Sequence, residues 1–140
     1  MRKILILLFS VLVFQACLIR TGKFILNNNT ESSIYYQLLS DTVPFYVKKY
    51  DLNVQFRLLC PYDTVNPPFV KGGDGAWVNM INKYAIDSAL HIFIFQTDKI
   101  TDELIKNREY ERLSFKVKEL DSLNWTVVYR GQNKMKEDAR

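Results

Sequence analysis

The sequence predicts an α+β domain with a mostly antiparallel sheet of five to six strands and two or three short helices. Strand-favouring and helix-favouring stretches follow one another in the order β-β-β-α-β-α-β-α-β, and no glycine-rich turn leads from a strand into a helix as in a doubly wound fold. The run 89–96 (ALHIFIFQ) carries no charge and is rich in Ile and Phe. It is too short for a buried helix, so we expect a strand covered on both faces, onto which the rest of the domain folds.

The first residues have the pattern of a secretory signal. Arg2 and Lys3 precede an uncharged apolar run of 11 residues, 4–14 (ILILLFSVLVF), which is too short to span a membrane comfortably. Ala16 and Cys17 follow closely, and this arrangement resembles a bacterial lipoprotein signal peptide. In that class the cysteine becomes the lipidated first residue of the mature chain.

This resemblance, together with the pattern of strands and helices and the polar composition of the last residues, predicts how the chain is divided. Residues 1–16 are a signal peptide, Cys17 carries lipid, 17–22 are a tether, 23–130 are a single α+β domain and 131–140 are a disordered tail. An N-terminal anchor that stays uncleaved is the alternative. If Cys17 is unmodified, a disulfide bond between Cys17 and Cys60 is the alternative fate of the two thiols.

The charge of the predicted mature chain argues against a nucleic-acid partner. The whole chain has 19 basic and 15 acidic residues, a net charge of +4, and it loses two basic residues with the signal peptide, which leaves +2. The body of the sequence contains no Lys/Arg cluster. The predicted partners are a membrane, through the N-terminal lipid, and an envelope protein or a glycan, but no nucleic acid.

The first half of the domain begins with two predicted strands. The β-favouring runs 23–28 and 33–39 flank an Asn-containing polar stretch at 29–32. Such a stretch between two strands is typical of a β-hairpin, in which the two strands pair with each other.

A third strand is predicted before a long loop. The apolar residues Leu52, Val54, Phe56 and Leu58 alternate with polar ones, so this set should face inward from a half-buried strand, and Cys60 has the same parity. The stretch 62–75 is rich in proline and glycine and is expected to be one long loop.

The second half predicts alternating helices and strands. Trp77, Met80, Ile81 and Tyr84 fall at i, i+3, i+4 and i+7, which predicts an amphipathic helix over 76–84. Thr101 is suited to cap a second helix, which should run to residue 109. Beyond it, apolar spacing predicts a strand over 113–117, a helical turn over 118–124 and a last strand over 125–130.

Roughly residues 72–130 resemble a known group of proteins. A helix containing Trp77 precedes an apolar strand at 92–95, Asp98 follows close to the strand end, and the stretch 123–129 (LNWTVVY) closes the domain after a charged helix. This order is similar to that of small uncharacterised envelope lipoproteins of Bacteroidetes-type bacteria. The resemblance implies a compact domain in the cell envelope, and it carries over no catalytic or binding residue because that group has no assigned activity.

Few side chains in the sequence suit catalysis or metal binding. His91 is the only histidine, and with Cys60 it would supply a base and a nucleophile, so a small hydrolase using this pair is the alternative function. We expect instead a hydrogen-bonded His91 near the start of its strand and a buried, inert Cys60. One histidine and two cysteines do not make the usual zinc ligand set, and no metal or cofactor is predicted.

Tyrosines in the N-terminal half are the remaining candidates for binding: Tyr35, Tyr36, Tyr46, Tyr50 and Tyr62. Core packing is the default expectation because half of the aromatic residues in a sheet face inward, and glycan or protein binding is the alternative. The sequence therefore predicts a cell-envelope protein, lipid-anchored to a bacterial membrane, with a structural or binding role and no catalytic centre.

Overall fold

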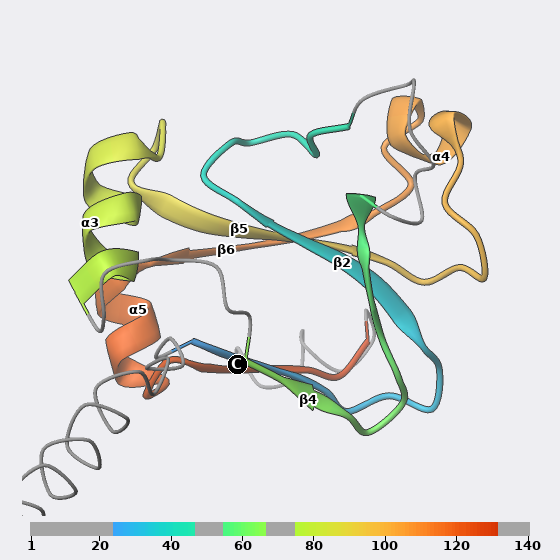
Figure 1. Cartoon of the computed structure of the whole chain (residues 1–140), viewed down its shortest axis with the longest axis horizontal. Helices are drawn as coiled ribbons and strands as arrows, with labels where there is room; N and C mark the ends of the chain where they lie inside the picture. The colour runs from blue at the N-terminus through green and yellow to red at the C-terminus, as the bar shows by residue number, and fades with distance from the viewer. Residues whose placement is uncertain (1–23, 47–54, 67–74, 132–140) are drawn as a thin grey trace, which may run out of the picture.

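The computed structural model describes residues 24–46, 55–66 and 75–131 (Figure 1). Its strands are β1 (Ile25–Asn28), β2 (Ile34–Leu39), β3 (Arg57–Leu59), β4 (Thr64–Val65), β5 (Ala89–Phe95), β6 (Glu111–Lys116) and β7 (Thr126–Tyr129). Its helices are α3 (Gly75–Tyr84), α4 (Asp102–Lys106) and α5 (Val117–Ser122). The predicted signal peptide, the tether and all but the first residue of the predicted tail lie outside the described residues.

The described strands form two sheets, and the domain is α+β as predicted. The larger sheet has four antiparallel strands in the order β3-β2-β5-β6. The smaller sheet has the order β4-β1-β7, with β1 antiparallel to β4 and parallel to β7. The strands are thus mostly antiparallel, as predicted, but they are divided between two sheets.

β5 is a central strand of the larger sheet and is buried on both faces. All seven of its residues are buried, which confirms the expectation from the uncharged run. Leu90, Ile92 and Ile94 contribute to the main core, whereas Phe93 and Phe95 belong to a second core on the opposite face. Since β2 and β6 pair with its two edges, β5 makes contacts on both faces and along both edges.

The main core lies between the two sheets and against α3 and α5, which stand at one end of the domain (Figure 1). Its largest side chains are two tryptophans, Trp77 of α3 and Trp125, which precedes β7. The ring centroids of Trp77 and Phe24 are 5.5 Å apart. The second core is smaller and consists of Phe56, Phe93, Phe95, Ile100 and Ile105.

The predicted hairpin of the first two strands is wrong. Both strands form, but β1 pairs with β4 and β7, while β2 pairs with β3 and β5. The turn between them is built around Asn28, which is fully buried. Its Oδ1 accepts hydrogen bonds from the backbone N and the hydroxyl of Thr30, and its Nδ2 donates to the carbonyls of Ser32 and Cys60. The turn therefore carries the chain from one sheet to the other.

The predicted inward set of the third strand is also wrong. Phe56 lies in the second core and Leu59 lies in the main core, on the opposite face of the larger sheet, as strand alternation places two residues that are three positions apart. Leu58 is 54% exposed, and Cys60 is exposed rather than buried. Leu58 pairs with Tyr35, which packs against the second core, but that core does not include Leu58. β3 is an outer strand and is only three residues long. Leu52 and Val54 lie outside the described residues.

The helices and strands predicted for the second half are confirmed, with shifted ends. Thr101 caps α4 by accepting a hydrogen bond from the backbone N of Leu104. This helix ends earlier than predicted, and Arg108 follows it in the left-handed conformation, with a φ of 59°. The predicted long loop contains the short strand β4, which the sequence did not reveal.

A hydrogen bond between side chains of β6 and β7 also joins the two sheets. The hydroxyl of Tyr129 on β7 donates a hydrogen bond of 2.9 Å to Oε2 of Glu111 on β6. Burial of Tyr129 raises the pKa of its hydroxyl, and the hydrogen bond to Glu111 and the charge of that carboxylate raise the pKa further. The contact therefore stabilises the protonated hydroxyl.

Replacing Phe93 or Ile94 by alanine should lower the free energy of unfolding by about 3 kcal/mol in each case, because a buried side chain is lost and a cavity remains. Urea denaturation at neutral pH measures this. Ile86→Ala is the control, since Ile86 is 76% exposed, and its midpoint should match that of the wild type. Midpoints for both core variants equal to that of the control would show that β5 is peripheral.

Tyr129→Phe should lower the free energy of unfolding by about 1 kcal/mol at neutral pH, since one hydrogen bond to a partly exposed carboxylate is lost. The pKa of Tyr129 in the folded state lies above its unfolded value of about 10. Its stabilising contribution is therefore complete below about pH 10 and is lost as the pH rises further.

Denaturation midpoints measured from neutral pH to about pH 11 should fall less steeply for Tyr129→Phe than for the wild type. Part of the fall in midpoint at high pH should remain in Tyr129→Phe, because burial also raises the pKa of Tyr36. Parallel curves for the wild type and the variant would contradict the assignment to Tyr129.

Candidate functional site

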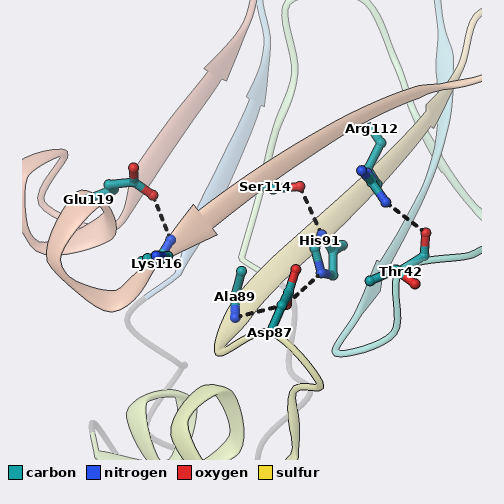
Figure 2. Close-up of polar contacts among 8 residues, drawn as sticks. All are labelled: Thr42, Asp87, Ala89, His91, Arg112, Ser114, Lys116 and Glu119. Carbon is teal, nitrogen blue, oxygen red and sulfur yellow. Dashed lines mark hydrogen bonds and ion pairs between the residues drawn. The ribbon is translucent and has the colours of Figure 1, made fainter.

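Three polar side chains meet on the face of the larger sheet that carries the second core. His91 Nδ1 lies 2.8 Å from Ser114 Oγ, and His91 Nε2 lies 3.0 Å from Asp87 Oδ1 (Figure 2). His91 is 1% exposed, whereas Ser114 and Asp87 are both exposed. We call this chain of contacts the Asp87–His91–Ser114 relay. It confirms the expectation of a hydrogen-bonded histidine near the start of the strand.

The pairing of β5 with β6 brings His91 and Ser114 together. The two residues stand directly opposite each other in the antiparallel pair. Side chains that face each other in this way have Cβ atoms about 5 Å apart, which is close enough for a serine hydroxyl to reach an imidazole. β6 is one of the two outer strands of the sheet, and Ser114 is exposed there while its partner is buried.

Asp87 reaches His91 because the chain turns sharply between α3 and β5. Ser88 has a φ of 57°, in the left-handed region, and its N–H donates to the carbonyl of Ala85. The backbone N of Ala89 donates to Asp87 Oδ1 at 3.2 Å. The oxygen that contacts the imidazole is therefore also held by the first residue of β5.

The surroundings of Asp87 favour its ionised form. Desolvation raises the pKa of Asp87, but the hydrogen bond from His91, the charge of His91 and the Ala89 N–H together outweigh it, so the pKa is lower than usual. A carboxylate has no proton to donate, and the proton in this contact therefore belongs to Nε2 of His91. In the neutral ring Nδ1 is then an acceptor, to which the hydroxyl of Ser114 donates.

The segment after β2 crosses the face that holds His91. Its Phe45 backbone exchanges two hydrogen bonds with the side chain of Gln37 on β2, at 2.8 and 3.0 Å. Its Thr42 carbonyl accepts a hydrogen bond of 3.0 Å from Arg112 on β6. Gln37 and Arg112 are each paired with Phe93 of β5, on opposite sides of it. The segment therefore passes over β5 next to His91.

Two basic residues flank Ser114 on β6. Arg112 and Lys116 lie two positions before and after it, and so project from the same face of the sheet. The contact with Thr42 fixes the position of the Arg112 guanidinium. The backbone N of Lys116 donates to Glu119 Oε2 at 2.6 Å, at the start of α5.

The structure does not bring Cys60 and His91 together. Leu59, the neighbour of Cys60, pairs with Ile34 at one end of β2, whereas His91 pairs with Leu39 at the other end. Ile34 and Leu39 are five positions apart along β2, a distance of about 17 Å. Both ring nitrogens of His91 are also engaged elsewhere. The alternative hydrolase based on this pair therefore has no geometric support.

The sequence did not single out Asp87 or Ser114. A serine on the polar side of a strand is an ordinary feature, and only the register of β5 with β6 shows that Ser114 faces the histidine. The sequence signal for Asp87 is weak as well, because an aspartate and a serine before a strand usually form a turn. The turn is present, and the Asp87 carboxylate also contacts the imidazole of His91.

The predicted tyrosines have different surroundings. Tyr36 is buried in the main core, and Tyr35 and Tyr46 are half-buried against the second core. Tyr62 is 64% exposed on the turn between β3 and β4. Tyr50 lies outside the described residues. One tyrosine of the predicted set is thus presented to solvent in the described part of the chain.

The described residues offer neither a metal cluster nor a membrane-spanning helix. Within 24–46, 55–66 and 75–131, no group of three His, Cys, Asp or Glu side chains is placed to hold a metal ion. The helices of these ranges include none with the length and apolar character needed to cross a membrane.

Asp87→Asn should weaken the dependence of stability on acid pH. Because the folded-state pKa of Asp87 is lower than its unfolded value of about 3.9, its contribution is present above that value and is lost as the pH falls through the folded-state pKa. Urea midpoints between neutral pH and about pH 2.5 should fall more for the wild type than for the variant. Asp98→Asn, on the exposed loop after β5, is the control and should follow the wild type. Identical curves for all three proteins would show that Asp87 is not held by the relay.

Comparison with known proteins found no match for this chain. No family model matches the chain, and no curated protein or solved structure matches it either. The resemblance to envelope lipoproteins therefore stays a prediction from the sequence.

Proposed function

We propose that this protein is a cell-envelope protein, lipid-anchored to a bacterial membrane through Cys17, with a binding or structural role. The sequence supports the anchor, since a basic pair, an apolar run of 11 residues and Ala16-Cys17 follow one another in the order of a lipoprotein signal. Two or more acyl chains hold a protein stably on a membrane, whereas one chain holds it only marginally. A lipidated Cys17 would thus fix an otherwise polar domain to the membrane surface.

The position of β1 supports the same proposal. Phe24 is fully buried in the main core, and the backbone N of Ile25 donates to the carbonyl of Trp125 at 2.8 Å. Six residues separate Cys17 from Phe24 in the sequence. Seven Cα–Cα steps span at most about 25 Å, so lipid on Cys17 would hold the start of β1 close to the membrane. This adjacency of a lipidation motif to a strand built into the core carries the proposal.

The opposite end of β1 is suited to a binding role. Asn28 fixes the turns at that end, and Tyr62 is exposed there. A polar hollow of about 600 Å³ adjoins it, lined by Thr30, Glu31, Ser32, Ser33, Pro61, Gln96, Thr97 and Asp98. An exposed aromatic ring beside polar side chains suits a glycan or a protein partner. With the anchor at the start of β1, this surface would point away from the membrane.

Cys17→Ser should prevent lipid attachment and leave the domain folded, because Cys17 precedes all the residues that form the two described cores. Expressed in a bacterium that processes lipoproteins, the wild type should fractionate with membranes. Its N-terminal peptide should begin at Cys17 and carry acyl groups, as measured by mass spectrometry. The variant should keep Met1 and carry no acyl mass.

Cys60→Ser is the matched control, since Cys60 is an exposed thiol at the other end of the domain, and this variant should be lipidated like the wild type. An unmodified Cys17 or a retained Met1 in the wild-type protein would contradict the anchor.

A further inference from the structure

We propose that Ser114 is a base-activated nucleophile that accepts acyl groups from small activated esters, and that the Asp87–His91–Ser114 relay is a serine acyl-transfer site on the outer strand of the larger sheet. This activity goes beyond the anchoring and binding role. It does not depend on lipid at Cys17.

The distances place each group within reach of the next. Ser114 Oγ and His91 Nδ1 are 2.8 Å apart, and His91 Nε2 and Asp87 Oδ1 are 3.0 Å apart. Both lie in the range that a nucleophile, its base and the group orienting that base require. The ionised Asp87 holds the proton of His91 on Nε2, which leaves the lone pair of Nδ1 for the serine hydroxyl. The logic is that of a Ser-His-Asp triad with the two ring nitrogens exchanged.

The base of the proposed site is buried and its nucleophile is exposed, as acyl transfer from a small ester in solvent requires. His91 is 1% exposed on a strand that is packed on both faces, so its ring is fixed. Ser114 is exposed on the outer strand, where a small ester can approach from solvent. A histidine with a packing role alone would need only some hydrogen-bond partner for each ring nitrogen, and these partners could be buried. Here the lone pair of the buried base is directed to an exposed hydroxyl.

The proposed step balances in atoms and charge. Ser114 Oγ attacks the ester carbonyl carbon while its proton passes to Nδ1 of His91, and the carbonyl oxygen takes the negative charge. When the carbon–oxygen bond to the alcohol breaks, that proton leaves with the alcohol and an acyl-serine remains. Water then attacks the acyl-serine, with Nδ1 taking one proton of the water and returning it to Oγ. The ester is thereby converted to an acid and an alcohol.

The charges beside Ser114 favour this step. Arg112 and Lys116 project from the same face on either side of it, and their positive charges would stabilise the negative carbonyl oxygen. The hydrogen bond to the Thr42 carbonyl holds the Arg112 guanidinium in place before any substrate arrives. The Asp87 carboxylate stands on the far side of the imidazole, where it stabilises the protonated ring.

An alkyl fluorophosphonate, which reacts irreversibly with activated serines, tests the proposal on the purified protein. Peptide mapping by mass spectrometry should locate the phosphonyl group on Ser114, and Ser114→Ala should remove it. Asp87→Asn should slow the labelling by about 100-fold, because the base loses the group that fixes its tautomer. Ser122→Ala is the matched control: Ser122 is exposed on α5 and its Oγ contacts the carbonyl of Lys118, so labelling should be unchanged. Circular dichroism melting checks that each variant is folded.

Three results would overturn the proposal: no label on Ser114 in the folded wild type, equal labelling of Ser114 and Ser122, or an unchanged labelling rate in folded Asp87→Asn. The membrane fractionation of the wild type is measured independently, so a failure of the anchor and a failure of the acyl-transfer site are distinguishable.

Discussion

The burial of β5 on both faces is the constraint on which the rest of the structure depends. A strand with no exposed face needs a packed layer on each side, and the chain supplies two different ones. The smaller sheet with α3 and α5 forms the main core on one side, and the aromatic second core lies on the other. β5 also fixes the registers of β2 and β6, which pair with its edges. One consequence is that His91 is buried beneath a covering segment while the residue opposite it, Ser114, is exposed.

A second constraint is the buried amide of Asn28. An amide without partners costs several kcal/mol when it is removed from water, roughly 2–7 kcal/mol depending on the reference state. Here the side chain has partners on both of its polar atoms, drawn from the β1–β2 turn and from the end of β3. These contacts hold together segments that belong to different sheets. They also place Tyr62 and the polar hollow at the end of the domain opposite the start of β1.

The sequence predicted the features that are encoded locally and missed those that depend on distant contacts. The helices and strands after residue 75 each carry their own periodicity, and Trp77, Ile81, Val127 and Tyr129 are buried as that periodicity requires. Tyr84, the last residue of the predicted helix stripe, is an exception, since it ends α3 and is 74% exposed. The hairpin prediction was wrong because polar turn residues show that the chain turns, but not which strand the next segment pairs with. The prediction that Leu58 and Cys60 face inward with Phe56 was wrong because apolar alternation shows which residues share a face, but not whether another layer covers that face. Ser114 became visible as a candidate only through the register of two strands that are far apart in the sequence.

The proposed chemistry depends on the position of one proton on His91. If Asp87 is ionised and Ser114 donates its hydroxyl proton, the neutral imidazole carries its proton on Nε2 and leaves Nδ1 bare. Two-dimensional ¹⁵N–¹H correlation spectra of the imidazole, recorded at about pH 8, distinguish the two tautomers and the charged ring. We expect the Nε2–H tautomer in the wild-type protein. A proton on Nδ1, or on both nitrogens, would contradict this interpretation, because the hydroxyl of Ser114 would then have no acceptor on the ring.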